Sequence, residues 1–420
     1  MIGLFNVRLL FTNFLSLGFV QILTSLSQLL VVPYMVSKTG VENYGVVVVA
    51  QVVMIYLSTF VDYGFNQTAT REVSLNRNNH RLLSQVFSRV LYTKLFLCVA
   101  SFAFILLLSL VLPFIRHHFL LYCMAFIYVP GASSMPVWFL QGMEKMRWMA
   151  LACLLSRILF VALVFLLIKN AGHADLCIFL LGGTSLLAGV ITNVIVFRKY
   201  KLQLVSTSLR DIYGSLKEGW QVVASNLSMN IIQYGNLFIL RIFTNDLAAG
   251  YYGVAERVFF SVKQLLVAFS QAVYPRICAL ASGGAEQVEI FVRKLFIPFF
   301  LLIVAGSIML ALMAPYIIEF FLQEANPTSV FILQMFCIVL PVVCLNIPGS
   351  LALLAYNRKK QYFMIYGSAV IISLFANLVL ASEYRETGTI AAILITELVI
   401  TVMAMVTLGR LLKNKLVVAT

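Results

Sequence analysis

Eight ionisable side chains lie inside long apolar segments of this sequence, where a charge is energetically unfavourable. They are Asp62, Lys94, Arg157, Arg241, Glu256, Arg257, Lys263 and Glu397. An ionisable residue within a membrane-spanning segment is a candidate for ligand binding or ion transfer. Five of the eight are basic, and guanidinium and ammonium groups bind phosphate or carboxylate oxygens. The set therefore predicts a cavity that attracts an anion.

Arg157, Lys263 and Glu397 are the most deeply placed of these residues. Each lies about nine or more residues into its segment, which is about 13 Å at a rise of 1.5 Å per residue. Snorkelling to the surface is difficult from that depth, so we expect these side chains to face a wet cavity or one another. A structural Arg157–Glu397 or Lys263–Glu397 ion pair is the alternative.

The other five charges lie nearer the predicted membrane boundaries. Asp62 and Lys94 are within a turn or two of the predicted cytoplasmic side, where long side chains also serve as interfacial anchors. Arg241 and the Glu256-Arg257 pair lie near the opposite boundary, where an ion pair between helices is the alternative. Arg157, Arg241, Arg257, Lys263 and Lys94 are the predicted anion-binding residues, and Asp62, Glu256 and Glu397 are predicted to gate or to couple an ion.

Polar side chains recur at helical spacing in four segments, which places each set on one helix face. The predicted lining residues that accompany these charges are Gln21, Thr24, Gln28, Gln51, Ser58, Asn226, Asn230, Gln233, Tyr252 and Ser270. We interpret the four faces as the lining of a shared space. The alternative is ordinary hydrogen bonding between neighbouring membrane helices.

The elements that must position these side chains are membrane-spanning helices. Of 420 residues, 61% are hydrophobic and 11% are charged, which is too apolar for a soluble domain. Since a span needs about 20 apolar residues, the sequence predicts an all-α polytopic membrane protein with about twelve transmembrane helices. The predicted spans are 10–36, 43–67, 88–112, 118–139, 149–168, 176–197, 219–243, 251–274, 295–316, 328–350, 363–381 and 388–408.

The basic residues between these segments predict the orientation. Alternate loops and ends carry 21 lysines and arginines on one side and 4 on the other. The richer side is expected to be cytoplasmic, which places both termini in the cytoplasm. Most of the net charge of +14 is therefore interpreted as a topology signal and not as a nucleic-acid-binding surface.

The second half of the sequence resembles the first at an offset near 208 residues. Tyr44-Gly45-Val46 matches Tyr252-Gly253-Val254, and two prolines in the fourth segment, Pro130 and Pro136, match Pro341 and Pro348. An even number of helices in each half predicts two parallel repeats of six helices. The predicted domains are an N-terminal lobe at 1–197, a cytoplasmic linker at 198–218 and a C-terminal lobe at 219–420.

Other chemistries lack their usual motifs. The seven cysteines form no CxxC pair and have no histidine at ligand spacing, so neither a metal site nor a disulfide framework is indicated. There is no GxxxxGK[ST] phosphate-binding loop. We expect no cofactor, no metal, no catalytic residue and no enzymatic activity.

Several short runs resemble the polysaccharide-transporter branch of the multidrug/oligosaccharidyl-lipid/polysaccharide (MOP) exporter superfamily, and most closely its O-antigen flippases of Wzx type. The runs are Pro33-Tyr34 with Gly40–Gly45, Asp62–Phe65 with Thr70–Glu72, Trp138–Lys145, and Tyr252–Arg257 leading to Tyr274-Pro275. The resemblance covers nearly the whole chain. It implies two V-shaped six-helix lobes around a cationic cleft.

The resemblance also implies a function in lipopolysaccharide biosynthesis. Members of this branch move an undecaprenyl-diphosphate-linked oligosaccharide, the O-antigen repeat unit, from the cytoplasmic to the periplasmic leaflet of the bacterial inner membrane by alternating access. Expected partners are this cargo, membrane lipid, H⁺ or Na⁺ as a coupling ion, an O-antigen polymerase and a chain-length regulator, and no nucleic acid. The alternatives are a drug or cation antiporter of the same superfamily, and a membrane O-antigen polymerase.

Overall fold

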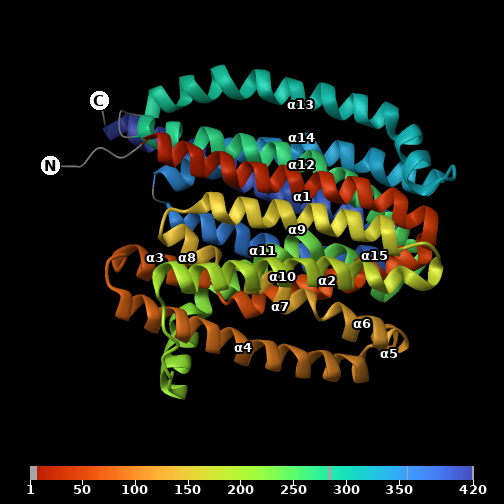
Figure 1. Ribbon diagram of the computed structural model, residues 1–420. Helices are drawn as coiled ribbons and strands as arrows, with labels where there is room; N and C mark the ends of the chain where they lie inside the picture. Colours follow the sequence, from red (N-terminus) through yellow and green to blue (C-terminus); the bar gives the residue numbers. More distant parts are fainter. Residues whose placement is uncertain (1–6, 282–284, 357, 419–420) are drawn as a thin grey trace. The chain divides into compact units, whose positions relative to one another are not determined.

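The computed structural model describes residues 7–281, 285–356 and 358–418, and these residues are almost entirely α-helical (Figure 1). Contact patterns divide the chain into two compact units, Met1–Asn230 and Ile231–Thr420, here called unit 1 and unit 2. The division falls within one long helix, α11. The predicted lobe boundaries at 197/198 and 218/219 stay a prediction.

Unit 1 contains short and long helices in succession. Their bounds are α1 Val7–Thr39, α2 Val41–Asp62, α3 Phe65–Leu75, α4 His80–Val111, α5 Pro113–His117, α6 Phe119–Ala125, α7 Tyr128–Ser134, α8 Val137–Gly142, α9 Met146–Leu167, a 3₁₀ turn Ala171–His173, and α10 Ala174–Tyr200. The helix α11 Leu209–Phe243 begins in unit 1 and ends in unit 2. Within the unit, α10 packs against α6, α7 and α9, and α1 packs against α9.

Unit 2 contains longer helices. They are α12 Asp246–Ala281, α13 Ala285–Leu322, α14 Pro327–Ala355 and α15 Lys359–Val418. The helix α14 contacts α12, α13 and α15. The backbone of α15 is non-helical at Arg385, with φ 50° and ψ −124°, and this kink separates the predicted spans 363–381 and 388–408.

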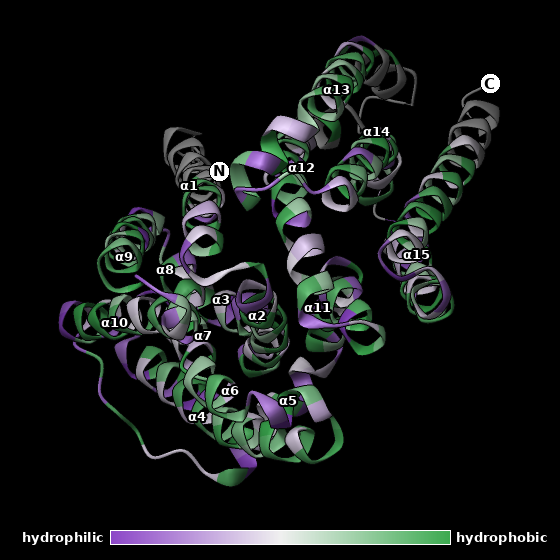
Figure 2. Ribbon diagram, turned by 90° about the vertical axis from the view of Figure 1, so that its right-hand side faces the viewer, coloured by the Kyte–Doolittle hydropathy of each residue, from purple (hydrophilic) through white to green (hydrophobic). Residues whose placement is uncertain are grey.

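Helices occur at all twelve predicted spans, and the chain is a polytopic all-α membrane protein. Within the described residues, eight helical segments are long and apolar enough to cross a membrane: Val41–Leu75, His80–Val111, Phe119–Gly142, Met146–Leu167, Ala171–Tyr200, Lys294–Leu322, Pro327–Ala355 and Lys360–Gly409. The last of these contains two predicted spans. The other three predicted spans coincide with α1, α11 and α12. The hydrophobic character of the spans is visible in Figure 2, where α4 and α13 are hydrophobic over most of their length.

The fourth predicted span is not one continuous helix. The structure divides it into α6, α7 and α8, because Pro136 cannot donate a backbone hydrogen bond and disfavours helical geometry at Met135. Met135 is extended, with φ −62° and ψ 121°. The corresponding helix of the second half, α14, runs through Pro341 and Pro348 without a break, so the two halves differ at this matched position.

Two glycines allow α7 and α10 to approach with their backbones in contact. A Cβ atom added to Gly131 would lie 2.3 Å from the carbonyl oxygen of Gly182, and one added to Gly182 would lie 2.5 Å from the backbone nitrogen of Tyr128. No side chain fits in either place. Small residues at such contacts are typical of packed membrane helices, and here they hold the broken fourth span against α10.

We therefore expect Gly182→Ala to destabilise the protein, although alanine normally favours a helix over glycine by about 1 kcal/mol. Overpacking should lower the unfolding free energy by about 1–3 kcal/mol. The matched control is Gly183→Ala, because an added Cβ at Gly183 meets nothing within 4 Å. Thermal unfolding of the purified variants checks this, and equal midpoints for both would contradict the proposed contact.

Candidate functional sites

The break between α7 and α8 leaves backbone carbonyls of the fourth span without their usual helical donors. The backbone N–H of Val137 bonds to the carbonyl of Met135 at 2.8 Å instead of reaching back to Ser133. Within a membrane these carbonyl oxygens need other hydrogen-bond donors, because a polar group without a hydrogen-bond partner is strongly unfavourable there. Two side chains from neighbouring helices supply those donors.

Lys94 of α4 satisfies one of these carbonyls. Its Nζ atom donates to the Ser133 carbonyl at 2.8 Å and to Asp62 Oδ1 of α2 at 2.7 Å. Lys94 is only 8% exposed, so the side chain turns into unit 1 and does not snorkel to the interface. From the sequence, Lys94 was predicted to bind an anion and Asp62 to gate or to couple an ion. In the structure the two side chains form one ion pair.

Asn193 of α10 satisfies the next carbonyl. Its Nδ2 atom donates to the Ser134 carbonyl at 2.7 Å and to Gly189, one turn earlier in α10, at 2.8 Å. Ser133 and Asn193 were not predicted from the sequence, because neither is ionisable and neither belongs to one of the four predicted polar helix faces. The signal in the sequence that could have identified the site is Pro136, because a helix broken there leaves the carbonyls of Ser133 and Ser134 without helical donors.

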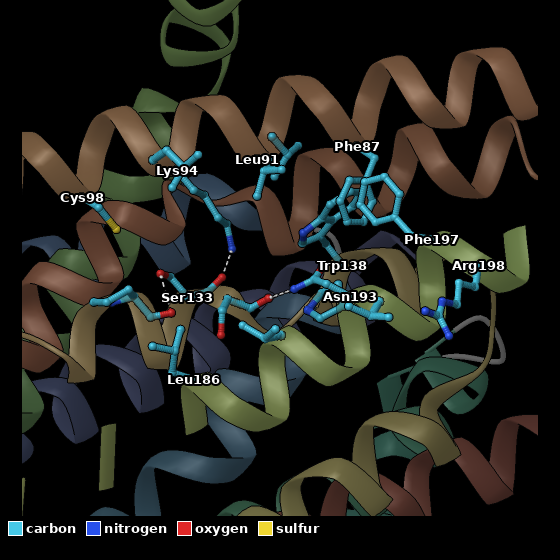
Figure 3. A pocket seen from close by; sticks show the side chains of 17 residues that line it. Phe87, Leu91, Lys94, Cys98, Ser133, Trp138, Leu186, Asn193, Phe197 and Arg198 are labelled. Atoms are coloured by element: carbon cyan, nitrogen blue, oxygen red, sulfur yellow. Dashed lines mark hydrogen bonds between the residues drawn. The ribbon is translucent and has the colours of Figure 1, made fainter. Parts of the chain in front are cut away.

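A cavity of about 480 Å³ adjoins this network, and we call it the Lys94 cavity. Figure 3 shows the Lys94 side chain reaching toward Ser133, with Leu186 and Asn193 nearby and the aromatic rings of Phe87, Trp138 and Phe197 farther along. Most of the lining is apolar. The polar groups come from Lys94 of α4, from Ser133 and Ser134 of the broken span, from Asn193, and from Arg198 at one end.

In unit 2, Glu397 of α15 is the centre of a second polar cluster, which we call the Glu397 cluster. Lys263 Nζ of α12 lies 3.4 Å from Glu397 Oε1, and Asn346 Nδ2 of α14 donates to Oε2 at 2.6 Å. Thr401 donates to Asn346 Oδ1 and, at 2.8 Å, to the Glu397 carbonyl. The Lys263–Glu397 pair that the sequence left as one alternative is therefore present.

An aromatic ring, a pair of asparagines and a small cavity lie beside the Glu397 cluster. Lys263 Nζ also lies 5.6 Å from the centre of the Phe259 ring, which is within the range of a cation–π interaction. Asn377 Nδ2 donates to Asn236 Oδ1 at 2.7 Å. A cavity of about 20 Å³ lies among Gln233, Asn236, Glu256, Lys263 and Glu397, which is enough room for one water molecule.

Glu256 and Arg257 are both buried in unit 2, at 3% and 8% exposure. Tyr252, one turn before Glu256, is completely buried and packs on Phe336 with 5.6 Å between ring centres. Glu256 and Lys263 line the same small cavity, as their predicted shared face requires. Ser270, two turns farther along, donates to the Leu266 carbonyl of its own helix at 2.8 Å.

Arg241, near the end of α11, forms an ion pair with Asp246, the first residue of α12. Its Nε and Nη2 atoms donate to the two carboxylate oxygens of Asp246 at 2.6 and 2.9 Å, and Nη1 donates to the Thr244 carbonyl at 3.0 Å. This two-point geometry is the strong form of an arginine–carboxylate pair. The structure therefore contains the ion pair between helices that was the alternative for Arg241, and its acidic partner, Asp246, was not predicted.

Arg157 of α9 differs from the other predicted cations. It is partly buried, and within the described part of the chain it forms no hydrogen bond and no ion pair. Its guanidinium is therefore free of the carboxylate neutralisation seen at Lys94, Arg241 and Lys263. Among the predicted anion-binding residues, Arg157 is the one whose guanidinium N–H groups have no acceptor among the described residues.

The remaining predicted lining residues are mostly partly buried. Asn230 Nδ2 donates to Thr59 Oγ1 of α2 at 2.6 Å, and Ser58 donates to the Ile55 carbonyl of its own helix at 2.9 Å. Thr24, Gln28, Gln51 and Asn226 are partly buried, and Gln233 donates to Tyr234 at 3.0 Å. The side chain of Gln21 lies outside the described residues. That these side chains line a cleft between lobes stays a prediction.

The sequence is similar to one protein family and to two proteins named as transporters. A family profile described as "Polysaccharide biosynthesis protein" matches residues 10–281. A protein of Escherichia coli (strain K12) named "Putative O-antigen transporter" is 27% identical over 390 residues, covering 93% of this chain and 94% of that protein. A protein of the same name from Shigella dysenteriae is 24% identical, covering 92% and 97% respectively.

Solved structures with a similar fold belong to transporters. An inward-facing multidrug-resistance MATE transporter of the MOP superfamily has a TM-score of 0.73 at 15% identity, covering 95% of this chain and 98% of that one. The lipid II flippase MurJ, in an inward closed conformation, has a TM-score of 0.70 at 14% identity, covering 97% and 91%. At these identities the likeness establishes the fold.

The Lys94 network predicts an order of stability among variants. Lys94→Met should lower the unfolding free energy by about 3 kcal/mol, because it leaves both a carboxylate and a carbonyl without their donor. Asp62→Asn should have a smaller effect, since an amide oxygen still accepts from Lys94. Lys169→Met, at an exposed position, is the control. Thermal unfolding measures the order, and a milder Lys94→Met than Asp62→Asn would refute it.

Proposed function

Because this chain belongs to the family of polysaccharide biosynthesis proteins, as the match over residues 10–281 establishes, we propose that it is a flippase for a lipid-linked oligosaccharide. The proposed cargo is an undecaprenyl-diphosphate-linked repeat unit of the O-antigen type. It moves from the cytoplasmic to the periplasmic leaflet of a bacterial inner membrane. The observation that carries this proposal is the family match together with two relatives named as O-antigen transporters that align over almost their full length.

The chemistry of the intramembrane residues supports an anionic cargo. A diphosphate cannot enter hydrocarbon without charged partners, since the desolvation of an unpaired ion is strongly unfavourable. Arginine binds phosphate oxygens through two parallel hydrogen bonds. Arg157, with its open donors, is the first candidate to contact the diphosphate. Arg257 and Lys263 are buried or partly buried within unit 2 and follow as further candidates.

The cations that already form an ion pair with a carboxylate cannot bind a phosphate in the way that Arg157 can. Lys94, Arg241 and Lys263 each hold a carboxylate, at 2.7, 2.6 and 3.4 Å respectively. Such a cation binds a phosphate only if its carboxylate is neutralised or moves away. Of the three pairs, Lys263–Glu397 has the longest separation, and Glu397 retains Asn346 as a second partner. We propose this pair as the one that exchanges during transport.

This exchange provides a physical route for ion coupling. Binding of H⁺ or Na⁺ at Glu397 would reduce its attraction for Lys263 and free the ammonium for an anionic headgroup. Release of the ion would restore the pair and expel the headgroup. Asp62 and Glu256 are the other carboxylates proposed for gating or coupling. The proposed partners beyond the cargo and membrane lipid are an O-antigen polymerase and a chain-length regulator.

Loss of the gene should trap the lipid-linked oligosaccharide on the cytoplasmic face. In a deletion strain without a related transporter, we expect the lipid-linked unit to be synthesised, surface polysaccharide to be lost, and the unit to be inaccessible to a periplasmic glycan-binding probe. A plasmid carrying the wild-type gene should restore exposure. Normal surface polysaccharide in the deletion strain would refute the flippase assignment.

The coupling proposal predicts a specific effect of Glu397→Gln. Transport into proteoliposomes should depend on a pH or sodium gradient in the wild type, and this dependence should weaken in the variant because the side chain no longer changes charge. Glu383→Gln is the matched control, since Glu383 lies exposed on the same helix. If Glu397→Gln kept the full gradient dependence, Glu397 would have no part in coupling.

A further inference from the structure

Two apolar grooves flank α10 in unit 1. One is the Lys94 cavity, between α4 and α10, and the other, which we call the Trp148 groove, has a volume of about 270 Å³ and lies between α9 and α10. Val190 and Val194 line the first, whereas Ile191 and Ile195 line the second. Adjacent residues of one helix therefore face different grooves, one on each side of α10.

Both grooves open onto the exposed apolar surface of the unit. In the Lys94 cavity, the lining residues Leu95 and Val190 are 54% and 50% exposed, and in the Trp148 groove Leu155 and Ile191 are 65% and 58% exposed. In a membrane-spanning protein, such apolar surface faces lipid chains. The material that fills these grooves in a membrane is therefore hydrocarbon.

Each groove ends at a cation, and the two cations are consecutive in sequence. Arg198 lines the Lys94 cavity and Lys199 lines the Trp148 groove, in the last turn of α10. Lys199 Nζ also lies 5.1 Å from the centre of the Trp148 ring. A tryptophan with basic residues is typical of the membrane interface, and basic pockets between helices at the cytoplasmic side bind anionic lipid headgroups.

The grooves have the length of one bilayer leaflet. The α10 residues that line the Lys94 cavity run from Leu186 to Arg198, and those that line the Trp148 groove run from Ala188 to Tyr200. Twelve residues of helix measure about 18 Å, and half of the hydrocarbon core measures about 15 Å. A hydrocarbon chain that starts at the basic end would therefore reach the middle of the membrane.

We propose that α10 is the binding site of one anionic phospholipid, with its phosphate at Arg198 and Lys199 and one acyl chain in each groove. Two grooves that converge on one pair of cations match a lipid with two chains on one headgroup. At the inner end of the Lys94 cavity, Asp62 neutralises Lys94, so no unpaired charge opposes a hydrocarbon chain. This resident lipid is distinct from the transported cargo.

The test measures lipid retention by native mass spectrometry of the detergent-purified protein, incubated with phosphatidylglycerol or with phosphatidylcholine. The wild type should retain one phosphatidylglycerol and little phosphatidylcholine. Arg198→Gln with Lys199→Gln should weaken retention about 25-fold, since each interfacial cation contributes about five-fold. Both residues are exposed, so this variant tests the headgroup contact without disturbing the core.

A second pair of variants tests the grooves. Val194→Trp fills the Lys94 cavity and should reduce retention. Leu187→Trp adds the same ring at an exposed position of α10 that lines neither groove, and should retain lipid as the wild type does. For the charge variant, Arg210→Gln with Lys217→Gln is the control, because these exposed cations lie outside both grooves.

Three results would overturn the proposal. These are equal retention of both phospholipids, retention unchanged by Val194→Trp or by the Arg198 and Lys199 variant, and displacement of phosphatidylglycerol by a single-chain polyprenyl phosphate. The last result would assign the grooves to the cargo's lipid tail. A flippase assay of the charge variant separates the two proposals, because loss of the resident lipid with transport retained would leave the proposed function unaffected.

Discussion

The requirement that every backbone carbonyl within a membrane has a hydrogen-bond donor governs unit 1 of this protein. Pro136 breaks the fourth span, and the carbonyls of Ser133 and Ser134 accept from Lys94 and Asn193. Lys94 in turn requires a counter-ion, which Asp62 provides at 2.7 Å. One proline thus accounts for a buried ammonium, a partly buried carboxylate and an amide on three other helices. The cavity beside them is lined by residues of α4, of the broken span and of α10.

Unit 2 uses its polar residues differently. The tenth span runs unbroken through Pro341 and Pro348, and Asn346 of that helix binds the Glu397 side chain. The polar groups of the Glu397 cluster are therefore bonded mainly to one another and not to carbonyls freed by a broken helix. A side chain that stabilises backbone carbonyls has to stay in place, whereas a carboxylate with two side-chain partners can exchange one of them. This difference favours unit 2 for ion coupling and unit 1 for a rigid framework.

The helical segments could be predicted from the sequence because hydrophobic length reports directly on membrane spans. The pairing of charges could not. Lys263 and Glu397 are 134 residues apart, and nothing in their spacing distinguishes that pair from Arg157 with Glu397. Asp246 was not singled out because it lies between the predicted spans 219–243 and 251–274, yet it pairs with Arg241. Ser133 and Asn193 were missed for a related reason, since their contribution depends on which carbonyls a neighbouring proline leaves free.

The kink at Arg385 affects how this protein can be labelled and detected. Two predicted spans meet at a single non-helical residue within α15, so that end of the helix pair presents a bend and no loop. An epitope tag or a fluorescent protein inserted there would have to separate two helices that now follow each other directly. On whichever side of the membrane this bend lies, it offers an antibody or a protease very little extended chain. Reporters are better placed at residues 206–208, which are non-helical and follow the backbone hydrogen bonds that tie Gln203 and Val205 to α4.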